Sequence, residues 1–233
     1  MKRWPVLFAG GLVALSLWGQ GAVRPAELGA ELARLLSTYA PVELFRQRLA
    51  LGSLAGQGEV SPQPALEALA GTEEALRALA EALSGDPAWE GTYQALVKAL
   101  EEVGRGARAL EGGPEEELVG ALGQVRGALE GVVTAASSDA NGQGQGWPLQ
   151  AAFLAQTVLL APSPLYLNVE ESWAAYLMRG LPPGFPSEGA LALDVLLGLA
   201  NRRLSREEEG RAREAAQVLL ESLLGPVGGG GGA

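Results

Sequence analysis

The chain has 233 residues, a formal net charge of −10, and neither cysteine nor histidine. The missing cysteine excludes disulfides, thiol nucleophiles, iron–sulfur sites and the lipidated cysteine of a lipoprotein, and the missing histidine excludes histidine-based triads and histidine-ligated zinc. Hydrophobic residues make up 48% and charged residues 19%, which is a globular balance, and the acidic excess disfavours nucleic acid as a partner.

The first 22 residues have the three parts of an export signal. Lys2 and Arg3 form a positively charged N-terminal region, and residues 6–18 are an uncharged, mostly apolar run. Residues 19–22 include the small residues that a signal peptidase site requires. A retained membrane anchor is the alternative, but a spanning helix needs about 20 apolar residues. We therefore expect cleavage after Gly21 or Ala22, which removes two cations and leaves a net charge near −12.

Composition and periodicity predict an all-α fold. Ala, Leu, Glu and Arg are abundant, residues that favour strands are scarce, and isoleucine is absent. Apolar positions recur at helical spacing along most of the chain. We expect about eight helices packed as antiparallel hairpins, in two helical halves after the cleaved signal peptide.

The N-terminal half spans residues 23–136. Pro41 suits the first turn of a helix, and Gly112 with Gly113 breaks the chain. Gly85 is expected to end one helix, and Asp86 to cap the next with Pro87 in its first position. For the helix over 64–83, an interruption at Gly71 and Thr72 is the alternative to one continuous helix. The predicted helices cover 25–39, 41–51, 64–83, 87–112 and 114–136.

A Gly-rich loop at 137–147 is expected to divide this half from the C-terminal half, residues 148–224. Asn168 with Glu171, and Ser205 with Glu208, have the spacing of capping boxes, and Ser187 is a further candidate cap. The helix after Ser187 is apolar nearly all round, which predicts central burial. A flexible tail, 225–233, follows. The predicted helices cover 148–161, 168–178, 187–200 and 205–224.

The loop that begins at Asp139 resembles the calcium loop of an EF-hand. Asp139, Asn141 and Gln143 take the first three ligand positions, and Gly144 takes the position of the sharp turn. Gln150 stands where that family has a bidentate glutamate, and a single carboxylate gives a weak field for a hard cation. The alternative is a polar linker without metal, and we expect no cofactor.

Residues 169–172, with the sequence VEES, resemble the Glu-Ser motif of lysozyme-like lytic transglycosylases. That resemblance implies a helical, exported, glycan-cleaving enzyme in which Glu171 or Glu170 is the catalytic acid. The other motifs of the family are not recognisable downstream. The alternative is a helix start, where acids near the positive end of the dipole need no catalytic role.

Asp194 is the one charge in a helix predicted to be buried. A buried carboxylate requires a partner or a raised pKa, so we expect a structural ion pair with Arg179, Arg202 or Arg203, with a functional acid as the alternative.

These features together favour a non-enzymatic protein of the bacterial cell envelope. It is expected to be periplasmic or secreted, to have no membrane span after signal cleavage, and to bind or scaffold another envelope protein or polymer. A carboxylate-dependent glycan-cleaving enzyme is the first alternative. A small-molecule enzyme resembling exported chorismate mutases is the second, although the arginine pattern of that family has no clear match here.

Overall fold

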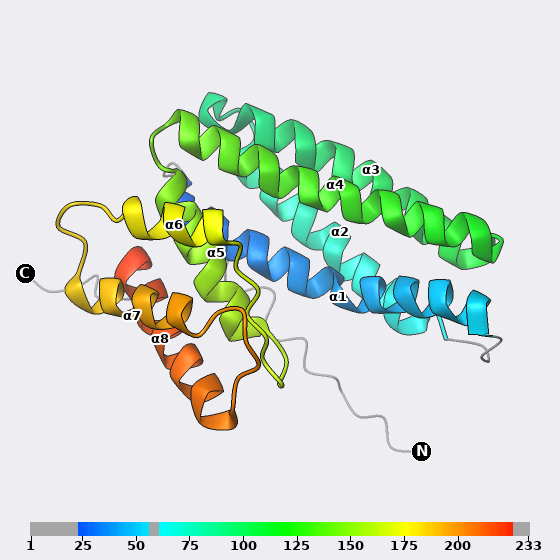
Figure 1. The fold of residues 1–233 in the computed structure, drawn as a ribbon. Coiled ribbons are helices and arrows are strands. Elements are labelled where there is room, and N and C mark those ends of the chain that lie inside the picture. The colour runs from blue at the N-terminus through cyan, green and yellow to red at the C-terminus, as the bar shows by residue number, and fades with distance from the viewer. Residues whose placement is uncertain (1–22, 56–60, 226–233) are drawn as a thin grey trace, which may run out of the picture.

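The computed structural model describes residues 23–55 and 61–225, and within these ranges the protein is all-α, as predicted (Figure 1). The proposed signal peptide, 1–22, and residues 226–233 of the proposed tail lie outside the described residues. A short 3₁₀ helix, η2 (Pro87–Trp89), precedes α3. The eight α-helices in these ranges are α1 (Pro25–Ala55), α2 (Gln63–Leu83), α3 (Glu90–Gly112), α4 (Glu115–Gly142), α5 (Gly146–Leu160), α6 (Glu171–Arg179), α7 (Ser187–Gly198) and α8 (Arg206–Leu224).

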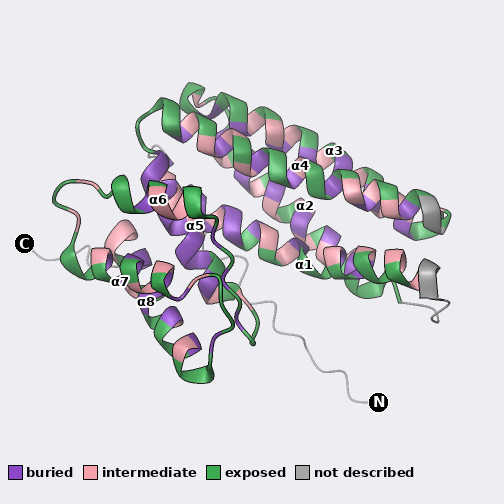
Figure 2. Ribbon diagram, in the orientation of Figure 1, coloured by how far each residue is buried: buried purple, intermediate pink, exposed green. Residues whose placement is uncertain are grey.

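Two hydrophobic cores form because most helices bury one stripe and expose the opposite face (Figure 2). The exception is α5, which is buried nearly all round and exposes only Thr157 and Leu160. The first core lies among α1, α2, α3 and α4, and Leu149 of α5 completes it. On α2, for example, Leu69, Leu76 and Leu83 recur every seven residues and are all buried. Removal of such side chains from water supplies the main stabilising free energy, at roughly 25 cal/mol per Å².

The second core lies among α5, α6, α7 and α8 and includes the extended segment 165–169. Trp147 at the start of α5 contacts both the end of α6 and the turn that follows it. Its indole N–H donates to the carbonyl oxygen of Leu177 at 2.7 Å, and its ring meets Phe185 edge-on at a centroid distance of 5.0 Å. The end of α6 and the turn after it are therefore held against α5.

The two cores are joined because α1 and α5 contribute to both. Leu28 and Leu32 of α1 belong to the first core, whereas Ala26 and Ala30 belong to the second. At the crossing of α1 and α5, a Cβ atom on Gly29 would collide with the carbonyl group of Leu149. The absence of a side chain at position 29 thus sets how closely the two helices approach.

The predicted boundary at Pro41 is wrong, because α1 continues through it as one helix. Pro41 removes one backbone hydrogen bond, but it lies on an exposed position. Tyr39, Val42 and Phe45 on either side of it are buried in the first core. Packing of one continuous apolar stripe outweighs the lost bond.

The predicted loop at 137–147 is too long, because α4 extends to Gly142. Ala136 and Ala140 are fully buried and continue the apolar stripe of the helix. Only residues 143–145 separate α4 from α5, with Gly144 in the left-handed region at a φ of 69°. Gly71 likewise does not interrupt α2.

Helix caps follow the sequence in some places only. The capping box of Ser205 and Glu208 is present at α8, and Asp86 caps η2 by accepting a hydrogen bond from the N–H of Ala88 at 2.9 Å. The predicted caps at α6 and α7 are wrong, because neither helix has a side-chain cap and Ser187 is already helical.

Central burial of α7 is also wrong. Leu191 is 67% exposed, and Leu193 and Leu196 on the other face are fully buried. None of the described helices is long and apolar enough to cross a bilayer.

Candidate functional site

Asp139, the first ligand of the proposed calcium loop, lies near the end of α4 and binds α3. Its Oδ2 accepts hydrogen bonds from the backbone N–H and the hydroxyl of Thr92, each 2.7 Å long. Thr92 is buried in the first turn of α3, where backbone N–H groups have no partner within the helix. Asp139 therefore places an acceptor and a negative charge at the positive end of the α3 dipole.

The other two proposed ligands contact different groups. Asn141 Oδ1 accepts a long hydrogen bond of 3.4 Å from the hydroxyl of Tyr176, and the side-chain amide of Gln143 donates to the carbonyl oxygen of Ala88 at 2.8 Å. Asp139 and Asn141 are helical, whereas calcium-loop ligands come from a loop that wraps the ion. The structure does not bring the three side chains together, and no metal-binding group of three or more carboxylates occurs in 23–55 and 61–225.

Glu170 and Glu171 stand at the exposed start of α6. Glu170 is the N-cap residue and Glu171 the first helical residue, and neither side chain is bonded to another described residue. A general acid for glycan cleavage needs an apolar pocket that raises its pKa, and these carboxylates face solvent. Their position suits charge stabilisation by the helix dipole.

Asp194 is exposed on α7, so the expectation that it is buried is wrong. It forms no ion pair with any residue that the structure describes, and Arg202, one of its proposed partners, pairs with Glu208 at 2.7 Å. The apolar face of α7 packs on one side only, which leaves the Asp194 position in water.

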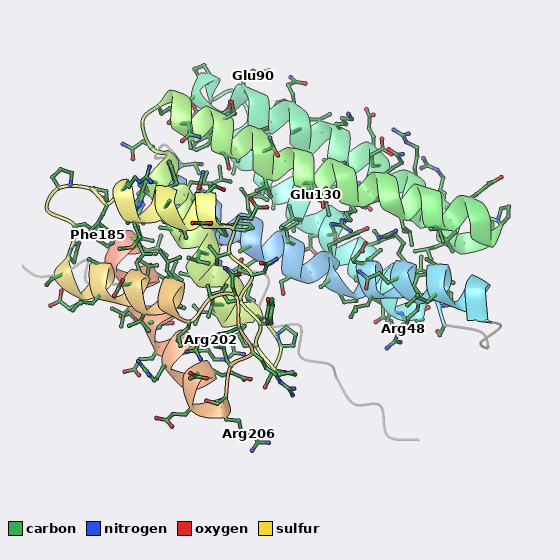
Figure 3. All side chains as sticks on the ribbon, viewed as in Figure 1. Arg48, Glu90, Glu130, Phe185, Arg202 and Arg206 are labelled. Atoms are coloured by element: carbon green, nitrogen blue, oxygen red, sulfur yellow. The ribbon has the colours of Figure 1, made fainter. Side chains whose placement is uncertain are left out.

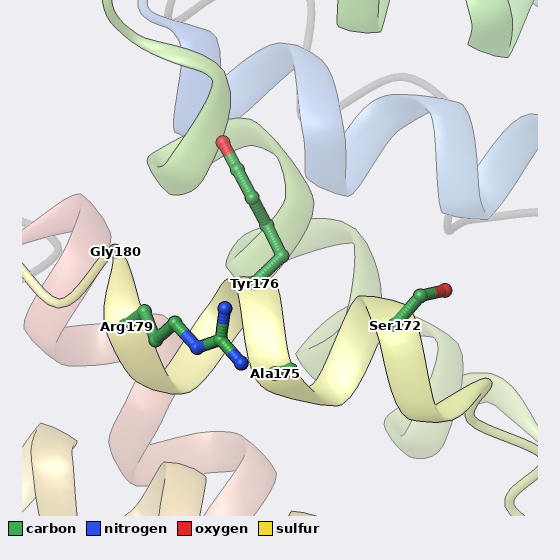
Figure 4. Close-up of a pocket in the computed structure, with 5 residues that line it drawn as sticks. All are labelled: Ser172, Ala175, Tyr176, Arg179 and Gly180. Carbon is green, nitrogen blue, oxygen red and sulfur yellow. The ribbon is translucent and has the colours of Figure 1, made fainter.

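A hollow of about 510 Å³ lies on the outer face of α6, wide open to solvent (Figure 4). Neither Glu170 nor Glu171 lines it. In Figure 4 the Arg179 guanidinium lies over the helix, and the Tyr176 ring rises toward the link between α4 and α5. The lining residues are Ser172, Ala175, Tyr176, Arg179 and Gly180.

A second, smaller hollow of about 250 Å³ lies between α3 and α4. Its lining includes Lys98, Gln124 and Glu102, which is 7% exposed. Arg105 donates a hydrogen bond to the carboxylate of Glu102 at 2.6 Å. The buried acid in this hollow is therefore already engaged within its own helix.

A charged network links α1 to α4. Glu43 accepts hydrogen bonds from Arg46 at 2.7 and 2.8 Å and from Arg126 of α4 at 3.3 Å. The hydrogen bonds from Arg46 are the main reason that the pKa of Glu43 is lowered to about 2. Beside it, the buried hydroxyl of Tyr39 donates to the carbonyl oxygen of Leu122 at 2.9 Å, and burial raises the pKa of Tyr39.

The glutamates that open α8 also have structural roles. Glu209 accepts hydrogen bonds from the hydroxyl of Ser163 at 2.8 Å and the N–H of Leu165 at 3.0 Å, and these bonds lower its pKa. Glu208 completes the capping box with Ser205. Glu209 thus holds the segment before α6 against α8, and Glu208 stabilises the start of α8.

Arg179 belongs to the half of the described arginines that make no ion pair. Charged side chains cover the outer helix faces (Figure 3), and many arginines pair with a glutamate three or four residues away. Arg179 makes no ion pair or hydrogen bond with the described residues, and the positions three and four before it hold Tyr176 and Ala175. From the sequence we considered Arg179 only as a partner of Asp194. The absence of an acid three or four positions before Arg179 could already have indicated an arginine without an ion pair in its own helix.

Comparisons with models of protein families, with curated proteins and with solved structures find no match.

Proposed function

We propose that the protein is an exported, non-enzymatic helical protein that binds or scaffolds another envelope protein or polymer. The supporting observation is a pair of exposed leucines on α1, called the α1 stripe below. Leu44 and Leu51 are 57% and 65% exposed and lie two turns apart on one face of the helix, outside both cores. This spacing suits a partner helix or an extended segment that lies along α1.

The part of α1 that carries the α1 stripe is packed against the first core. Tyr39, Val42 and Phe45 anchor the same part of α1 in the first core. A partner would therefore meet a preorganised surface and lose little free energy to ordering of this helix.

Site-specific photocrosslinking tests the proposal. A benzoylphenylalanine in place of Arg48, between the two leucines, should give a discrete adduct with an envelope component in living cells. The same probe at Glu101, an exposed position on α3, is the matched control. The double substitution Leu44→Glu and Leu51→Glu should abolish the adduct without loss of helix content. Absence of any adduct, or the same adduct at Glu101, would contradict the proposal.

The glycan-cleaving alternative is tested separately. Incubation of the purified protein with peptidoglycan should release no soluble fragments. Release that disappears in the double variant Glu170→Ala and Glu171→Ala would establish an enzyme and overturn the non-enzymatic proposal.

A further inference from the structure

The hollow on α6 collects polar groups along a single helix face. Its lining residues are spaced by three, four, seven and eight positions from Ser172, which places them on one stripe. Ala175 and Gly180 leave space for the hollow because neither has a side chain beyond Cβ. Gly180 is also required by packing, because a Cβ atom there would come within 2.6 Å of the indole ring of Trp147.

Three groups on this stripe have free hydrogen-bonding capacity. The guanidinium of Arg179 and the hydroxyl of Ser172 have no partner in the described part of the chain, and the hydroxyl of Tyr176 makes only the long contact with Asn141. The helix dipole accounts for a cation in the last turn of α6. It accounts neither for the hollow nor for two hydroxyl groups on the same face.

The charges around the hollow favour an anionic ligand. No acidic residue lines it, although the chain as a whole carries a charge of −10. An unpaired guanidinium offers a planar pair of N–H donors that matches a carboxylate or a phosphate. The Tyr176 ring, 36% exposed, offers a flat apolar surface beside it.

The length of the ligand follows from helix geometry. Ser172 and Arg179 are seven residues apart, or about 10 Å along the helix axis. A ligand that contacts both has an oxyanion at one end, an apolar middle over Tyr176, and a hydrogen-bonding group at the other end.

We propose that this hollow binds an elongated ligand through a terminal carboxylate or phosphate. Arg179 holds the oxyanion, Tyr176 packs against the apolar part, and Ser172 bonds to the far end. This site is independent of export and of the α1 stripe, because it is assigned from α6 alone and is measured on purified protein.

Titrations monitored by amide chemical shifts in NMR spectra test this site. The probes are N-acetylglycyl-phenylalanine, which carries the carboxylate, and phenyl phosphate, which carries the phosphate. The neutral control is the C-terminal amide of the same dipeptide. We expect one or both anions to bind with a dissociation constant in the millimolar range, and the shift changes to cluster on α6. The stronger of the two anions identifies the source of the oxyanion.

Variants locate the contact. Arg179→Gln should weaken binding of the anionic probe by about tenfold or more, as expected for the loss of a charge-assisted hydrogen-bonded pair. Arg108→Gln, which removes another exposed arginine without an ion pair in the described residues, should leave binding unchanged. Ser172→Ala should weaken binding of the dipeptide but not of phenyl phosphate, which is too short to reach it.

The proposal is overturned if the dipeptide amide binds as tightly as the acid, a comparison that requires no variant. Equal loss of affinity in Arg179→Gln and Arg108→Gln would also overturn it, because it would show general attraction of anions to any surface cation. Absence of shift changes on α6 with both probes has the same consequence.

Discussion

At the scale of single residues, a few side chains join helices that are distant in sequence. Asp139 of α4 binds the first turn of α3 through Thr92, and Arg213 of α8 donates to the carbonyl oxygens of Val158, Leu159 and Ala161 at the end of α5. In each case a charged group satisfies helix-end groups of opposite polarity. These contacts give Asp139 and Arg213 structural roles.

Substitution of Asp139 by alanine should lower the thermal stability. It leaves the buried hydroxyl and N–H of Thr92 without an acceptor, at a cost of about 1–3 kcal/mol. For a chain of this size, each kcal/mol lowers the melting temperature by about 2–4 °C. Thermal unfolding followed by circular dichroism measures the change. Asp139→Asn keeps an acceptor oxygen and should lose less, and equal losses in the two variants would contradict this role.

Glu43 makes part of the stability depend on pH. Its pKa is lowered from 4.5 to about 2 in the folded protein, chiefly by Arg46. Its contribution is therefore complete above pH 4.5 and is lost as the pH falls from 4.5 toward about 2.

Urea unfolding at several pH values should show that Glu43→Gln is less stable than the wild type at pH 7 and that the difference narrows below pH 4.5. Glu101→Gln, at an exposed acid without an ion pair among the described residues, should follow the wild-type profile. A constant difference between Glu43→Gln and the wild type at every pH would exclude this linkage.

At the scale of helices, close approach decides which glycines matter. Gly29 lies against the backbone of Leu149 where α1 crosses α5, whereas Gly127 faces open space on α4. Substitution by alanine is therefore expected to change the stability in opposite directions at these two positions.

Gly29→Ala should destabilise the protein by about 1–3 kcal/mol, because α1 and α5 must separate to admit the methyl group. Gly127→Ala should stabilise it by about 0.5–1 kcal/mol, because alanine favours the helix and meets nothing. Chemical denaturation of the two variants measures both. A neutral Gly29→Ala would show that the crossing is looser than described here.

Local patterns in the sequence predicted some helix ends, at α8 and η2, but failed at α6 and α7. Helix ends set by packing could not be predicted. The capping box of Ser205 and Glu208 depends on a local spacing and is present. The last turns of α4 contain Asp139, which accepts hydrogen bonds from Thr92, 47 residues away, and no local pattern contains that contact. Passage of α1 through Pro41 likewise depends on a core that other helices build.

The candidate site was predictable only in part. The spacing of Ser172, Tyr176 and Arg179 on one face of α6 is a sequence property. That this face stays open depends on how α6 is held, through burial of Leu177 and the bond from Trp147. The acids considered as catalytic candidates from the sequence, Glu170 and Glu171, lie at the helix start and outside the hollow.

At the scale of the whole molecule, the two cores are coupled through α1 and α5. Both helices would lose buried partners if either core opened. We therefore expect one cooperative unfolding transition and not two.

Single-tryptophan variants test this coupling. Trp89 belongs to the first core and Trp147 to the second. In a variant that keeps only Trp89 after position 22, and in one that keeps only Trp147, fluorescence and circular dichroism should report the same denaturant midpoint. Separate midpoints for fluorescence and helix content in either variant would show that the cores unfold independently.

Export is the central claim of the account, since the envelope partner and the localisation depend on it. The most direct test is the intact mass and the subcellular fraction of the native protein. The account predicts material outside the cytoplasm that begins immediately after Gly21 or Ala22. Cytosolic material that retains Met1 would contradict it.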